Sequence, residues 1–195
     1  MAVVGLAAML AYRGLYGQIP LLLAMGMAAI TSFLFIKFTH LFRHANLKLQ
    51  NKQLKRGGSI TRAGWVFATA AVIVFVLTAH SFTVQYEFWR GRLAFATAGV
   101  GDEVWLGGGA WWHKATPDQR TMVGNALWHF ERGRRISLME TPATLQDLVW
   151  LHLASGDIQS AERTVRRLLE LIPDAADPHR GLAGILRLTN RPSEA

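Results

Sequence analysis

The sequence predicts an all-α protein in two parts, a transmembrane domain over residues 1–90 and an extramembrane helical domain after it. Two apolar runs in the first part are long enough to cross a bilayer, and helix-start signals recur in the second. The formal net charge of +8 comes entirely from the first part, where nine basic side chains oppose one acid, Glu87, whereas 12 basic and 12 acidic residues balance in the rest. Cations gathered between apolar runs are typical of a cytoplasmic loop rather than of nucleic-acid binding.

The two apolar runs predict transmembrane helices at about 18–42 and 63–85. Residues 17–36 and 63–85 carry no charge, so each run meets the length of roughly 20 residues that a bilayer core requires. The segment 2–15 is also apolar but only about half as long as a span. It fits a secretory signal poorly, because it has neither a basic start nor a small-x-small cleavage site. Two interpretations stay open for it: a partial third span, or an interfacial turn beside two spans.

The loop 43–62 between the spans sets the predicted topology. It contains six Lys or Arg residues and no acid, and short loops with that bias stay in the cytoplasm. The residues after the second span are therefore expected outside. The loop also contains three apolar residues, Leu47, Leu49 and Leu54. It either lies on an anionic lipid leaflet or is a solvated loop whose only role is to orient the spans.

Residues 91–140 are interpreted as a Gly/Trp-rich connector followed by a capping helix. No regular element is obvious between Gly91 and Ala115, and the three glycines at 107–109 predict a flexible turn rather than a phosphate-binding loop. A helix is expected from Thr116 as N-cap with Pro117 in the first position. The tryptophans of this region are candidates for contact with the membrane surface or a partner protein.

Residues 141–195 predict a helical hairpin and a further partial one. The first helix begins after Thr141, Gly156 and Asp157 separate it from the second, and Pro173 ends that second helix. The apolar and small residues between these points follow the 34-residue spacing of a tetratricopeptide (TPR) repeat, and adding 34 continues the pattern. His152 departs from it by standing where an aromatic residue is usual. We therefore expect a TPR-like domain of about one and a half repeats.

Arrays of this kind usually offer a concave binding face and rarely perform chemistry. The docking of a partner protein is therefore the expected role of the domain. The residues that we predict to bind the partner are aromatic or stand at an unusual position in the repeat: Trp105, Trp111, Trp112, Trp128, Trp150 and His152.

The residues that could carry chemistry are few. The chain has no cysteine, which excludes iron–sulfur clusters, thiol catalysis and disulfides within it. His40 and His80 lie in or beside the spans and could ligate haem or a chlorin through neutral imidazole. They are expected near opposite faces of the bilayer, so we do not expect them to share one cofactor. No acid–base pair or metal-ligand spacing is evident, so we expect no enzyme activity and no cofactor.

Three segments resemble a known family. AYRGLYGQIPLLLA, LKLQNKQLKRGGSITRAGWVFA and TAHSFTVQYEFWRGR, within about residues 5–92, resemble the C-terminal membrane portion of polyferredoxin-type bacterial membrane proteins. In that family, cytoplasmic 4Fe-4S modules precede the final spans, and some members carry a TPR-like tail outside. The cysteine-rich modules are absent from this chain. The resemblance therefore implies a redox-associated scaffold in a bacterial membrane whose electron-carrying part is missing, either lost or supplied by another chain. With the topology predicted from the basic loop, the chain is expected in the inner membrane with its C-terminal domain in the periplasm.

Together these observations favour a non-catalytic accessory subunit of a photosynthetic or respiratory membrane complex. Its spans would pack on other integral membrane subunits and on lipid, and its tail would dock a periplasmic subunit or electron-carrier protein. Two alternatives remain: a haem- or chlorin-binding electron-transfer or pigment protein, and a transient assembly factor.

Overall fold

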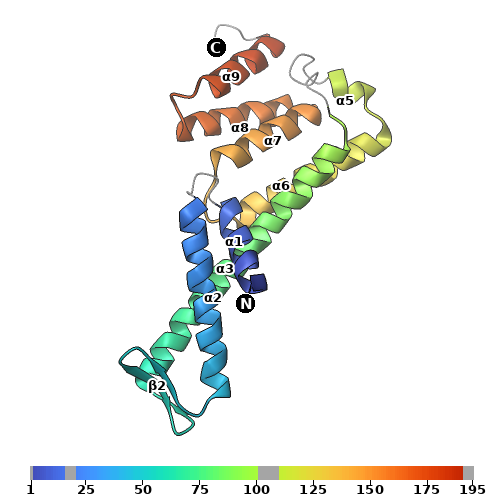
Figure 1. The fold of residues 1–195 in the computed structure, drawn as a ribbon. Helices are drawn as coiled ribbons and strands as arrows, with labels where there is room; N and C mark the ends of the chain where they lie inside the picture. The colour runs from blue at the N-terminus through green and yellow to red at the C-terminus, as the bar shows by residue number, and fades with distance from the viewer. Residues whose placement is uncertain (1, 16–20, 101–109, 191–195) are drawn as a thin grey trace. The chain divides into compact units, whose positions relative to one another are not determined.

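A computed structural model describes residues 2–15, 21–100 and 110–190, and it is mostly helical, as predicted (Figure 1). The chain divides into two compact units, Met1–Gln85 and Tyr86–Ala195. The elements in chain order are α1 (Ala2–Leu15), α2 (Leu21–Arg43), β1 (Leu47–Leu49), β2 (Lys52–Arg56), β3 (Ser59–Ile60), α3 (Arg62–Thr97), α5 (Ala110–Lys114), α6 (Pro117–Ile136), α7 (Pro142–Ala154), α8 (Ile158–Leu171) and α9 (Ala176–Leu188).

Two helices of the described chain are long and apolar enough to cross a membrane, at Met25–Arg43 and Arg62–Thr97. Only 17% of the most apolar window of each is buried inside the protein, unlike the core helix of a soluble domain. α1 has 14 residues, about 21 Å at 1.5 Å per residue, which is shorter than a bilayer core. It packs antiparallel to α2, because Ala8 and Ala28 are buried together while Gly5 approaches Ser32.

The segment between α2 and α3 forms a three-stranded antiparallel sheet, which the all-α prediction did not include. Arg56 pairs with Ser59 across a two-residue turn, and both turn residues, Gly57 and Gly58, have positive φ angles of 55° and 87°. This is the backbone that a tight hairpin turn requires and that glycine adopts without strain. The alternation of leucine with polar residues before the turn is the sequence pattern typical of a strand with one buried face.

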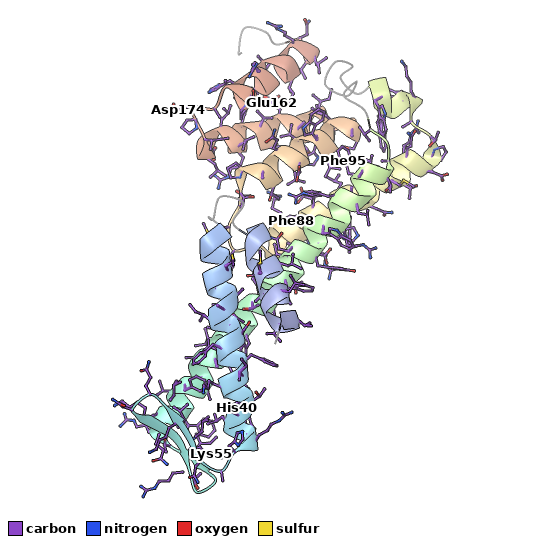
Figure 2. The ribbon with its side chains drawn as sticks, viewed as in Figure 1. His40, Lys55, Phe88, Phe95, Glu162 and Asp174 are labelled. Carbon is purple, nitrogen blue, oxygen red and sulfur yellow. The ribbon has the colours of Figure 1, made fainter. Side chains whose placement is uncertain are left out.

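The sheet packs on the adjoining ends of α2 and α3 (Figure 1). Leu47 and Leu54 join Leu41 and Ala68 in a small apolar cluster. Lys55, labelled in Figure 2, donates a hydrogen bond from Nζ to the carbonyl oxygen of Leu41 at 2.9 Å and so satisfies one free carbonyl at the end of α2. The basic segment is therefore an ordered element whose leucines face the protein.

In the second unit, α3 continues beyond the predicted span to Thr97, so the expectation of no regular element from Gly91 is wrong for residues 91–97. The expected helix starts are confirmed. Thr116 and Gln119 form a capping box at α6, and Thr141 accepts a hydrogen bond from the amide of Thr144 at α7. α7 and α8 then form the predicted hairpin, and α9 packs against α8 (Figure 1).

The C-terminal part of α3 is joined to α6 by two reciprocal contacts between phenylalanine and glycine. A Cβ atom on Gly91 would lie 2.5 Å from the Phe130 ring, and one on Gly133 would lie 2.7 Å from the Phe88 ring. The two rings also touch each other, with centroids 5.5 Å apart. Each glycine thus provides the hollow that the opposite ring fills. Since Phe88 and Phe130 are 6% and 1% exposed, this joint is part of the core.

We predict that Gly133→Ala lowers the free energy of unfolding by about 1–3 kcal/mol, because the new methyl group overpacks the joint. Gly124→Ala is the matched control in the same helix, since a Cβ there meets nothing within 4 Å. It should be neutral or stabilising by up to about 1 kcal/mol. Chemical unfolding of both variants in detergent, followed by tryptophan fluorescence, measures the difference. Equal stabilities would contradict the proposed packing.

Candidate functional site

The candidate binding site is a groove between α7 and α9, which we call the α7–α9 groove. It has a volume of about 330 Å³ and is lined by Gln146, Trp150, Asp177, Arg180 and Gly181. The two helices lie beside the groove because both pack against α8. Ala161 and other small or branched residues, buried on α8, form the core of the hairpin.

The α7–α9 groove offers an aromatic wall and a charged wall. Trp150 is half-buried and packs against the core, so its ring is held in place rather than free to rotate. Asp177 and Arg180 form an ion pair one turn apart on α9, and both side chains are more than three-quarters exposed. Such an exposed pair contributes little to stability, so its charges are available to a partner. The arrangement suits a peptide or protein surface with one apolar anchor and polar flanks.

The structure distributes the other predicted tryptophans differently. Trp111 and Trp112, on α5, pack against the helical core, and the guanidinium of Arg120 lies 5.5 Å from the Trp112 ring. Trp128 is 55% exposed on α6. Trp105 lies outside the described residues. Of the four predicted tryptophans that the structure describes, Trp150 alone lines the groove.

His152 lies inside the second unit. It is 8% exposed, and its Nε2 atom is 3.8 Å from a carboxylate oxygen of Glu131. Its Nδ1 atom is buried without a hydrogen-bond partner among the described residues. Burial lowers the pKa of His152, an effect that the nearby Asp157 and Glu131 only partly oppose, so the neutral ring is favoured. This burial leaves little of the side chain for a partner to contact.

The structure does not bring the two candidate cofactor ligands into one site. His40, on α2, packs edge to face against His44 with ring centroids 5.0 Å apart (His40 is labelled in Figure 2). His80, on α3, has a buried Nε2 atom with no hydrogen-bond partner among the described residues. Within the described ranges, no group of three or more His, Cys, Asp or Glu side chains could hold a metal ion.

Sequence reasoning missed a buried charge cluster at the joint between α3 and α6. Glu87 is 5% exposed, and its carboxylate lies 2.7 Å from Nδ1 of His129 and 3.3 Å from Nε of Arg132. A buried carboxylate is tolerated only when it is paired in this way. One signal was visible in the sequence, because Glu87 is the single acid among the first 90 residues. Its partners, more than 40 residues later, carried no such signal.

Further ion pairs fasten α3 and α6 to the hairpin. Arg92 of α3 contacts Asp147 of α7 at 2.9 Å. Burial raises the pKa of the Asp147 carboxyl, and the charge of Arg92 opposes that rise. Glu140 accepts hydrogen bonds from Arg167 and Arg134, which lower its pKa. The helices that line the groove are thereby supported by contacts that include the C-terminal end of α3.

Comparison of the chain with family models, with curated proteins and with solved structures finds no match.

We predict that His152→Phe reduces the loss of stability that the wild-type protein shows at acidic pH. Because the folded pKa of His152 is depressed, the unfolded chain binds more protons than the folded one as the pH falls below the ordinary histidine pKa of about 6.5. The contribution of the neutral His152 to the free energy of unfolding is thus fully present above that pH and decreases below it. The melting temperature of the variant should fall less than that of the wild type between about pH 7 and pH 5.

His113→Gln is the control, since His113 is exposed on α5. Its melting temperature should follow the wild-type pH profile. A wild-type profile in the His152→Phe variant as well would show that His152 does not cause the acid sensitivity.

Proposed function

We propose that the chain is a non-catalytic scaffold subunit of a bacterial membrane energy-conversion complex, photosynthetic or respiratory. α2 and α3 span the inner membrane and pack on other integral subunits, and the second unit docks a periplasmic partner in the α7–α9 groove. One observation carries the proposal. The helix that is apolar enough to cross a membrane continues without a break to Thr97, and its last residues belong to the unit that forms the groove.

The charge distribution supports the orientation. Met1–Gln85 contains eight Lys or Arg residues and no Asp or Glu, so no carboxylate within that unit can neutralise them. Six of the eight lie at 43–62, in and beside the sheet that joins the inner ends of the two spans. A short segment with this bias stays in the cytoplasm. The second unit then lies in the periplasm.

The helices of the second unit support a TPR-like role. α7 and α8 pack as a hairpin through Ala161, Val165 and Leu168, the positions that the 34-residue spacing selects. α9 occupies the place of the first helix of a following repeat, with Ile185 and Leu186 buried. In such arrays the first helices of successive repeats line the concave face, and here α7 and α9 line the groove.

The assignment to an energy-conversion complex rests on the resemblance of residues 5–92 to the membrane portion of polyferredoxin-type proteins. The residues of this sequence include no cysteine to hold a cluster, and the proposal assigns the electron carrier to another subunit. A scaffold that positions such a subunit needs a membrane anchor and a docking surface, both of which the proposal assigns.

The test is purification of the tagged protein in mild detergent, followed by mass spectrometry of the proteins that co-migrate. The proposal predicts respiratory or reaction-centre subunits in a fixed ratio to the tagged chain. A protein that runs alone would contradict it. Clients present at low and variable ratio would favour a transient assembly factor instead.

We predict that Arg180→Glu reduces the amount of the periplasmic partner that co-purifies, because it reverses a charge on the wall of the groove. Arg187→Glu is the matched control, since this arginine is also exposed on α9 but does not line the groove. The amount of partner that co-purifies with this control should equal that of the wild type. Both variants should have the melting temperature of the wild type. Equal losses, or no loss in either, would place the docking surface elsewhere.

The second candidate function is a cofactor-binding electron-transfer or pigment protein, and one observation favours it. The buried Nε2 of His80 has no hydrogen-bond partner in the part of the chain that the structure describes, and this atom could ligate the iron of haem or the magnesium of a chlorin. This candidate predicts visible absorbance in the purified protein that His80→Leu abolishes and His113→Leu does not. Colourless protein would exclude it.

A further inference from the structure

One end of the second unit carries a pair of highly exposed apolar side chains, Leu138 and Met139. They lie in the connection between α6 and α7, and their exposed fractions are 70% and 62%. Connections in soluble domains are usually polar, and consecutive large apolar residues this exposed are costly in water. Contact with an apolar surface outside the described residues would therefore be favourable for the pair.

The pair is held in place by its own backbone. The Ser137 hydroxyl donates a hydrogen bond to the carbonyl oxygen of Met139 at 2.6 Å and accepts one from the Met139 amide at 3.3 Å. The amide of Ser137 also caps the end of α6 by donating to the carbonyl oxygen of Gly133. Leu138 is thus presented at the tip of an ordered turn.

The contacts between α3 and α6 show which end of the unit this turn occupies. Gly91 faces Phe130 and Phe88 faces Gly133, so the two helices are antiparallel. α6 ends at Ile136, three residues or about 4.5 Å beyond Gly133. That distance brings its end level with the start of the unit at Tyr86, where the apolar run of α3 stops.

The same end of the unit carries the features of a membrane–water interface. Tyr86 and Trp89 are 43% and 57% exposed on α3 and lie 6.0 Å apart, ring to ring. Arg90 donates a hydrogen bond to the Tyr86 hydroxyl at 3.2 Å. Aromatic side chains with a cation beside them are typical of the headgroup level of a bilayer.

We propose that Leu138 and Met139 insert into the outer leaflet of the bilayer and fasten the second unit to the membrane surface. We infer that the occupant is lipid rather than a protein groove, because the turn follows the end of α6, which is level with Tyr86, and Tyr86 and Trp89 are exposed aromatic residues of the kind found at a bilayer surface. The turn acts as a second membrane contact beside α3, and it holds the α6–α7 connection at headgroup depth. This inference rests on the proposed insertion of α3 in a membrane.

The absence of cysteine from the chain allows a direct test. Single substitutions Leu138→Cys and Met139→Cys are made in the full-length protein, labelled with an environment-sensitive fluorophore and reconstituted in nanodiscs of phosphatidylcholine and phosphatidylglycerol. Fluorescence is measured with doxyl-labelled phosphatidylcholine in the bilayer or with iodide in the buffer. Two control positions are labelled in the same way. Val76→Cys, 60% exposed on α3, reports the proposed span, and Leu188→Cys, 45% exposed on α9, reports a surface of the second unit in water.

The proposal predicts that probes at 138 and 139 lose fluorescence with doxyl lipid, as the probe at 76 does, while iodide quenches only the probe at 188. Quenching of 138 and 139 by iodide, with 76 still quenched by lipid, would overturn the proposal and leave the membrane span intact. Protection of 138 and 139 from both quenchers would also overturn it, because protein would then cover them. Failure of lipid to quench the probe at 76 would contradict the span itself, and the proposal with it.

Discussion

The joint between α3 and α6 is the constraint on which the second unit depends. Phe88 and Phe130 each occupy the hollow left by a glycine on the opposite helix, so the helices approach more closely than any side chain at positions 91 or 133 would allow. The contact fixes their register, because sliding either helix by one residue would drive a ring into backbone. α6 then returns antiparallel along α3, and the hairpin that forms the groove is built on this pair.

The same joint explains why Glu87 can be buried. Its carboxylate is removed from water only when α6 supplies His129 and Arg132, and an unpaired charge at that position would cost several kcal/mol. An incorrectly docked α6 is therefore penalised twice, by lost ring packing and by an isolated charge. Packing provides the affinity between the helices, and the buried pair adds specificity for one register.

The structural features that could be predicted from the sequence are those that depend on residues close together in the chain. The starts of α6, α7 and α8 followed from their capping residues, and the two apolar helices followed from composition. The sheet was missed because leucines among lysines also fit a solvated loop. Gly91 suggested a connector, although its missing side chain accommodates Phe130 of a distant helix. In the groove, Trp150 was predicted from its residue type, whereas Asp177 and Arg180 reach the site only through the packing of α9 on α8.

The central claim is that the C-terminal end of α3 is part of the second unit rather than a linker to it. Hydrogen–deuterium exchange of the full-length protein in nanodiscs tests this most directly. The account predicts that amides of residues 86–92 and 126–133 exchange as slowly as those in the core of α7 and α8, because all open together in one cooperative unit. Exchange of residues 86–92 within seconds, with α7 and α8 still protected, would contradict it.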